Sequence, residues 1–135
     1  MSRPAPFTGL SHVQLLVSDV DASAAWYRGA LGLEGFVEDR ATGYIALRHR
    51  PSRVVVVLTT RPADGPMASG PEVLDHLALA VPDGDTLREW AEHLTAVGID
   101  HGGVVSEDGR PSLQLVDPDG TTIELVAPAP RPTAG

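Results

Sequence analysis

One short stretch of this chain occurs twice, and each copy has a histidine in second place. The first copy, SHVQLLVSDVD, begins at Ser11, and the second, DHLALAVPDGD, begins at Asp75. Aligning the two copies brings six pairs into register: His12 with His76, Leu15 with Leu79, Val17 with Val81, Asp19 with Asp83, Asp21 with Asp85 and Trp26 with Trp90. Such a repeat indicates one supersecondary unit used twice, so the plan of that unit decides the fold.

The similarity continues to the end of each copy. LGLE at 31–34 matches VGID at 97–100, and 51–58 lies over 118–125. Alternating apolar residues predict strands, and helical spacing of apolar residues predicts helices. Each copy is expected to have the order β-α-β-β-β. The first has strands at 10–17, 35–39, 44–49 and 53–60 and a helix at 22–31; the second has strands at 75–81, 100–106, 111–116 and 121–127 and a helix at 86–97.

Residues that favour helix ends support these helices. Aspartates suited to N-caps and glycines suited to the positive φ after a helix occur at Asp19 or Asp21, Asp83 or Asp85, Gly32 and Gly98. The apolar stripe of the second helix is expected at Leu87, Trp90, Ala91, Leu94 and Val97.

The chain is therefore predicted to be an α+β protein with two βαβββ modules in one compact domain. The first module takes residues 1–60 and the second takes residues 73–128. A linker rich in Pro, Gly and Ala, at 61–72, connects them, and 129–135 is expected to form a flexible tail.

Composition excludes several classes of function. A net charge of −8 argues against general affinity for nucleic acid or for an anionic membrane. The absence of cysteine removes disulfides, thiolate zinc sites and cysteine nucleophiles. No apolar run is long enough to span a bilayer, and the first residues lack the apolar core of a signal peptide. A cytoplasmic protein is expected.

Strand alternation predicts which side chains share a face of each sheet. The helices must cover the faces that carry the alternating apolar residues of the first and last strands. His12, His76 and Glu124 then point away from the helices, and they converge in one cleft if the two sheets curve toward each other. A single strand histidine is usually structural or on the surface, and His49, His93 and His101 lack the repeat relation.

Two imidazoles and one carboxylate on one face are typical of a divalent metal site. This donor set suits Fe²⁺, Mn²⁺, Ni²⁺ or Zn²⁺ and leaves positions open for substrate or O₂. We predict one such metal per site, held by His12, His76 and Glu124. In the repeat, Glu124 aligns with Val57, so the first module supplies a histidine but no carboxylate.

Other polar residues on the same predicted face are candidates for substrate binding. They are Gln14, Tyr44, Arg48 and Gln114. Arg48 suits a carboxylate or phosphate of the substrate, although an arginine at a strand edge is also common in solvent.

HVQLLVSDVDASAAWYRGALGLE and DPDGTTIELVAP resemble the vicinal oxygen chelate superfamily from about Phe7 to Pro128. That superfamily contains glyoxalase I, methylmalonyl-CoA epimerase, extradiol dioxygenases, fosfomycin-modifying enzymes and bleomycin-binding resistance proteins. The resemblance implies paired βαβββ modules that form an incomplete barrel around a metal cleft. It also implies that His12, His76 and Glu124 are the ligands.

The resemblance favours some reactions over others. Glyoxalase I and the epimerase use a fourth protein ligand where this chain has Val57, whereas extradiol dioxygenases and fosfomycin enzymes use His, His and Glu. The implied function is a metal-dependent enzyme of the dioxygenase type or the lyase/isomerase type, acting on a small organic molecule with adjacent oxygens. The alternatives are a drug-sequestering protein for antibiotic resistance, and a degenerate member with a scaffold role.

The resemblance also implies a homodimer. In this superfamily the modules pair within one chain or between two chains, and the linker at 61–72 allows either arrangement. The sequence leaves both open.

Overall fold

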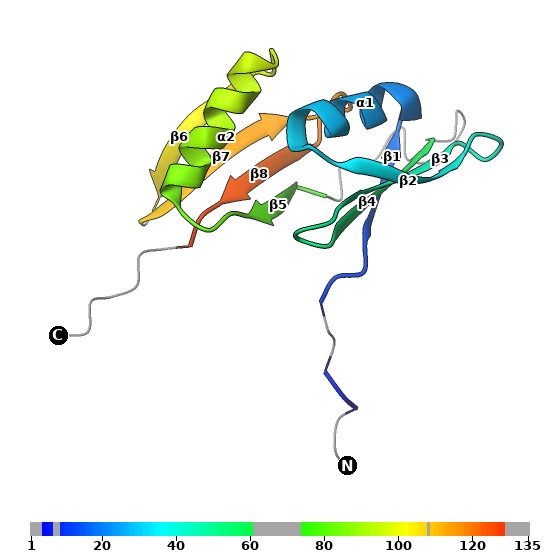
Figure 1. The fold of residues 1–135 in the computed structure, drawn as a ribbon, viewed down its shortest axis with the longest axis horizontal. Coiled ribbons are helices and arrows are strands. Elements are labelled where there is room, and N and C mark those ends of the chain that lie inside the picture. Colours follow the sequence, from blue (N-terminus) through cyan, green and yellow to red (C-terminus); the bar gives the residue numbers. More distant parts are fainter. Residues whose placement is uncertain (1–3, 7–8, 61–73, 108, 129–135) are drawn as a thin grey trace.

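The computed structural model describes residues 4–6, 9–60, 74–107 and 109–128, which form two βαβββ modules (Figure 1). Module 1 contains β1 (Val13–Val17), α1 (Val20–Leu31), β2 (Glu34–Asp39), β3 (Tyr44–His49) and β4 (Val54–Thr60). Module 2 contains β5 (His76–Ala80), α2 (Gly84–Ala96), β6 (His101–Glu107), β7 (Arg110–Val116) and β8 (Thr122–Val126). The predicted linker and tail lie outside the described residues.

Each module has one four-stranded sheet with the same topology. The strand orders are β1-β4-β3-β2 and β5-β8-β7-β6, and in each sheet the first and last strands of the module pair in parallel. Gln14 pairs with Val57, and Ala78 pairs with Glu124. Since Gln14 and Ala78 are equivalent in the repeat, the strand register confirms that Val57 and Glu124 are equivalent too.

The helix caps follow local side-chain chemistry. Asp19 and Asp83 are the N-caps, and their carboxylates accept hydrogen bonds from the backbone N–H of Ala22 and Thr86. Gly32 ends α1 with a φ of 71°, which a residue with a Cβ adopts only at a cost. The sequence offered two candidate N-cap aspartates for each helix, and these contacts identify Asp19 and Asp83.

Two predictions about element ends were wrong. The first strand was expected from residue 10 but β1 begins at Val13, so His12 lies just before the strand. Val97 was expected in the buried stripe of the second helix. It is instead the C-cap of α2 and is 48% exposed, because the helix ends before that position can turn toward the sheet.

The two modules share one apolar core on the helix side of the sheets. Tyr27 of α1 and Leu87 of α2 are fully buried in the same cluster as Leu15, Leu58, Leu113 and Ile123. Figure 1 shows both helices on the same, upper side of the molecule. The opposite side of each sheet is its open face. Within the described residues, no helix is long and apolar enough to cross a membrane.

Polar contacts reinforce the joint between the modules. The Tyr27 hydroxyl of α1 donates to Asp117 Oδ2 at 2.7 Å, and Asp117 lies in the turn between β7 and β8. Asp119 in the same turn accepts from the backbone N–H of Ser18 at 3.0 Å. His93 Nε2 of α2 donates to the carbonyls of Gly29 and Ala30 at the end of α1, both at 3.1 Å. The joint therefore holds the modules by their helix sides.

Candidate metal centre

The open face of module 2 brings two predicted ligands together. His76 begins β5, and Glu124 lies in the neighbouring strand β8, where it is level with Ala78. Both alternate with side chains that pack toward the core, because Leu77, Ile123 and Leu125 point to the helix side. His76 pairs with Thr122, so it is offset by two residues from Glu124 across the two strands.

Each of these two side chains has a hydrogen-bond partner. His76 Nδ1 donates to Asp75 Oδ2 at 2.7 Å, and this contact is the main reason that the pKa of His76 lies above its usual range. It leaves Nε2 as the ring nitrogen available for a ligand bond. Gln114 Nε2 donates to Glu124 Oε2 at 3.0 Å. Such outer contacts are typical of residues that bind divalent metals.

The ring of His12 also has a hydrogen-bond partner, but His12 lies in module 1, just before β1. Its Nδ1 shares a hydrogen bond of 2.9 Å with Ser11 Oγ. Ser11 precedes His12 as Asp75 precedes His76. His12 lines a cavity of about 370 Å³ between the modules, which the edge strand β5 lines with residues Leu77–Ala80. In the described part of the chain, however, no three His, Asp or Glu residues come close enough to hold one metal.

Module 1 has apolar side chains where module 2 has its carboxylate. Val57 is only 3% exposed, and its partner in β3, Ala46, is also buried. The corresponding pair in module 2 is Glu124 and Gln114. Because each pair occupies the same places in its sheet, the described structure has a carboxylate–amide pair in module 2 and an apolar pair in module 1.

The remaining predicted site residues lie on the open faces of their sheets. Gln14 is exposed, and its Nε2 donates to Thr59 Oγ1 at 2.8 Å. Tyr44 and Arg48 lie in β3 on the side of Ala46, and both are half-buried. Gln114 donates its hydrogen bond to Glu124. The alternation that predicted these positions is therefore confirmed, while their roles toward a substrate stay predictions.

Arg48 has an unusual environment on this face. Its guanidinium lies over the ring of Phe36, with Cζ 5.0 Å from the ring centroid. Its Nε is buried and has no hydrogen-bond partner within the described residues. An unpaired buried donor costs about 1–3 kcal/mol, so an acceptor that reached this N–H would be stabilising.

The sequence reasoning missed two kinds of residue. Asp75 and Ser11 were not identified as supports of the histidines, although their equivalent places in the repeat are a visible signal. Phe36 was not placed beside Arg48, because a β-bulge between Gly35 and Val37 shifts the register of β2 against β3. Regular alternation does not reveal such a bulge.

Comparison with known proteins agrees with this architecture. The family model described as Glyoxalase/Bleomycin resistance protein/Dioxygenase superfamily matches residues 9–125. The chain belongs to this superfamily. The resemblance to the vicinal oxygen chelate superfamily that the sequence motifs indicated is thereby confirmed.

Solved structures of similar proteins share the fold. A glyoxylase/bleomycin resistance protein/dioxygenase domain from Frankia sp. EAN1pec is 25% identical with a TM-score of 0.76, and the match covers 90% of this chain and 98% of that chain. Lactoylglutathione lyase from Agrobacterium tumefaciens is 21% identical with a TM-score of 0.73, covering 91% and 96%. A variant of the fosfomycin resistance protein FosX from Listeria monocytogenes, complexed with Mn(II) and 1S,2S-dihydroxypropylphosphonic acid, is 17% identical with a TM-score of 0.69, covering 90% and 91%.

Proposed function

We propose that this protein is a divalent-metal-dependent enzyme that acts on a small organic substrate with two adjacent oxygens. His12, His76 and Glu124 would hold one Fe²⁺, Mn²⁺, Ni²⁺ or Zn²⁺ ion. When bound, the metal would stabilise negative charge on the substrate oxygens. Three protein ligands leave coordination positions for both of these oxygens.

The observation that carries the proposal is the arrangement of His76 and Glu124. They lie on neighbouring strands of one sheet, offset by two residues, and each has a hydrogen-bond partner that leaves its other ligand atom free of that contact. A solvated surface pair would need neither Asp75 nor Gln114. A pair of surface residues with no ligand role would explain why both are exposed. It would not explain why each of them has a hydrogen-bond partner.

The third ligand would come from a second copy of the chain. Within one chain, the Tyr27–Asp117 hydrogen bond joins the modules on their helix sides, and the open faces are only partly covered, since Val57 and Ala46 are buried there. Apolar side chains on these faces are well exposed, including Phe36, Val105 and Val116. Pairing module 1 of one chain with module 2 of another would cover these side chains and bring His12 to His76 and Glu124.

The reaction would be of the dioxygenase type or the lyase/isomerase type. The similar solved structures include a lactoylglutathione lyase and a fosfomycin resistance protein, so the fold accommodates different chemistries. In this chain, Gln14, Tyr44 and Gln114 are the uncharged polar groups placed to orient a substrate on the open faces. Val57 in place of a fourth ligand favours reactions that need more open metal positions.

A sequestering protein is the second candidate. Phe36, a residue that is 44% exposed, favours the binding of an aromatic drug on the open face of module 1. Such a resistance protein would bind its drug without turnover and without a metal. Metal content therefore separates the two candidates.

Elemental analysis of the full chain, purified anaerobically with added iron or manganese, tests the proposal. We expect stoichiometric metal in the unchanged protein and its loss in His76→Ala and Glu124→Gln. The matched control is His101→Ala, since His101 is bound to Thr95 of α2 on the helix side and should not affect metal content. Absence of metal from the unchanged protein, or equal metal in all variants, would exclude this site.

A further inference from the structure

Arg48 lies on the open face of module 1 and is not one of the proposed metal ligands. Within the described residues, no hydrogen bond or ion pair joins Arg48 to another side chain. Its cross-strand neighbour Glu34 pairs with Arg50, with Nε and Oε2 3.5 Å apart. The Phe36 ring supports the guanidinium from one side. A cation held against an aromatic ring, with no protein anion of its own, is suited to an anionic ligand.

The strand register relates Arg48 to the proposed ligand His12. Arg48 pairs with Val55 in β4, and Val13 pairs with Val56, so His12 is level with Val55. Arg48 and His12 therefore lie in one row across the sheet, two strand spacings or about 10 Å apart at the backbone. Arg48 lies on the open face, and continuing the alternation of β1 by one residue places His12 on the same face. An arginine side chain can span much of that distance.

Module 2 has no cation at the equivalent place. The repeat and the pairing of Val116 with Thr122 show that Val116 occupies the position of Arg48. Arg110 shares the open side of β7 by alternation, but it lies four residues from Gln114, about 13 Å along the strand. The row of the first-strand histidine therefore contains an arginine in module 1 and none in module 2.

We propose that Arg48 binds a carboxylate of the substrate, so that the substrate is a small organic acid with two adjacent oxygens elsewhere in the molecule. This inference rests on the proposed function for the oxygen pair. The planar guanidinium matches a carboxylate with two parallel hydrogen bonds. A doubly charged phosphonate is a poorer fit, since Arg48 is the one cation in the strand row of His12 among the described residues and the chain carries a net charge of −8. Binding would also give the covered Nε–H an acceptor as the side chain moves to the ligand.

Two probes that differ in one group test this assignment. 3,4-Dihydroxybenzoate and 3,4-dihydroxybenzamide both carry adjacent oxygens, and only the first carries a carboxylate. Their dissociation constants are measured anaerobically by calorimetry with the full chain, with and without Mn²⁺. We expect the acid to bind about tenfold or more tightly than the amide.

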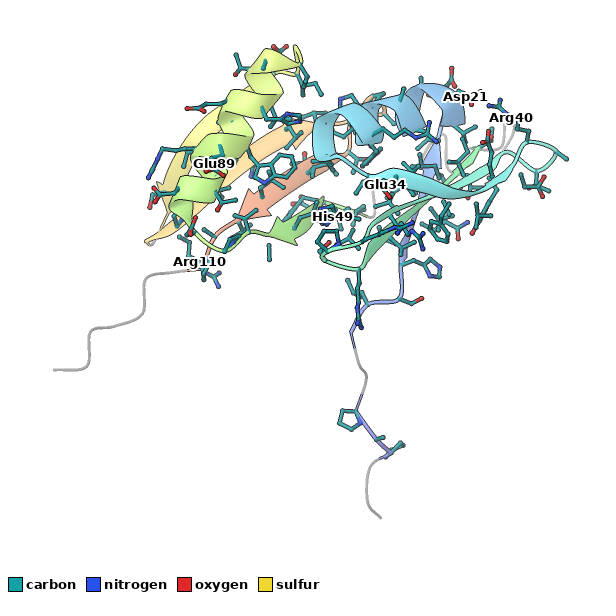
Figure 2. All side chains as sticks on the ribbon, in the orientation of Figure 1. Asp21, Glu34, Arg40, His49, Glu89 and Arg110 are labelled. Carbon is teal, nitrogen blue, oxygen red and sulfur yellow. The ribbon has the colours of Figure 1, made fainter. Side chains whose placement is uncertain are left out.

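The variants isolate the arginine. Arg48→Met keeps an unbranched side chain beside Phe36 but removes the charge, and it should reduce the acid-to-amide ratio to about one, with amide binding unchanged. Arg48→Lys, which keeps the charge, should retain part of the ratio. Arg110→Met is the matched control and should keep all of it, because Arg110 lies in module 2 at the start of β7 (Figure 2).

The outcomes separate this inference from the proposed function. A ratio near one in the unchanged protein, or a ratio that survives in Arg48→Met, would overturn the role of Arg48. A ratio that needs Arg48 without any dependence on Mn²⁺ would support Arg48 and contradict the metal-dependent function. Binding of neither probe would overturn both.

Discussion

Modules 1 and 2 have the same backbone plan and different open faces. Both have an N-cap aspartate, a glycine with positive φ after the helix, and a first strand paired in parallel with the last. On the open faces, Val57 and Ala46 stand where Glu124 and Gln114 stand in module 2. At another pair of equivalent positions the charged residue is in module 1, where Arg48 stands in the place of Val116.

Positions that fix the backbone are therefore alike in the two modules, and positions on the open faces differ. Helix caps and turns are set by local geometry, which both copies share. An open face has no such constraint, so each copy can specialise. Module 2 carries the carboxylate and its amide support, whereas module 1 carries the cation and its aromatic support. Exchanging residues between equivalent positions of the two modules tests this difference.

Glu124→Val gives module 2 the side chain of module 1, and it should have the largest effect. Metal affinity should fall by at least about a hundredfold, because even loss of a ligand's hydrogen-bond partner costs ten- to hundredfold. Calorimetric titration with Mn²⁺ measures this change. Thr122→Val, on the same strand and face, is the control and should retain metal. Equal loss in both variants would point to a damaged strand rather than a missing ligand.

Val57→Glu makes the reverse exchange. Val57 is buried, so a carboxylate there should lower the free energy of unfolding by about 2–4 kcal/mol in metal-free protein. Added Mn²⁺ should restore part of this stability if the new carboxylate reaches the metal. Urea unfolding with and without metal measures both effects. An unchanged free energy of unfolding would contradict the buried position of Val57.

Gln114→Ala gives module 2 the residue found at Ala46. It removes the hydrogen bond to Glu124 Oε2 and should weaken metal binding about tenfold, with little change in stability. The same Mn²⁺ titration measures it. Ser112→Ala, one position along the same face of β7, should leave the affinity unchanged. If the two variants behave alike, Gln114 does not support the ligand.

Tyr27→Phe tests the contact between the two modules. Module 2 has no counterpart of this tyrosine, because the repeat aligns Tyr27 with Ala91. Removing the hydroxyl leaves buried Asp117 with one donor fewer and should lower the free energy of unfolding by about 1–2 kcal/mol at pH 7. Urea unfolding at a fixed pH measures the difference. Tyr44→Phe, on the open face, is the control and should change stability less.

The same residue predicts an alkaline pH dependence. Burial, followed by the hydrogen bond to Asp117, raises the pKa of Tyr27 far above its usual value. Above about pH 10 the unfolded chain then loses the tyrosine proton before the folded chain does, so stability falls as pH rises. The chain has no lysine to titrate in that range. Tyr27→Phe should show a smaller fall between pH 9 and pH 11.

Much of the fold could be predicted because the repeat doubles every signal. Strand alternation placed Gln14, Arg48 and Glu124 on the open side, and the structure confirms these positions. The contact of Tyr27 with Asp117 could not be predicted, since it joins residues far apart in the sequence and has no counterpart in the repeat. The sequence also could not show that His12 precedes β1, because strand ends depend on hydrogen bonds with a neighbouring strand.

Metal binding by a mixture of two defective chains tests most directly whether the two modules complete each other across a dimer. His12→Ala and Glu124→Ala chains are produced separately and by coexpression, and their metal content is compared. Neither variant alone should hold metal, whereas the coexpressed protein should recover one intact site per mixed dimer, or roughly a quarter of the unchanged content with random pairing. Recovery of no metal in confirmed mixed dimers would contradict a site shared between chains.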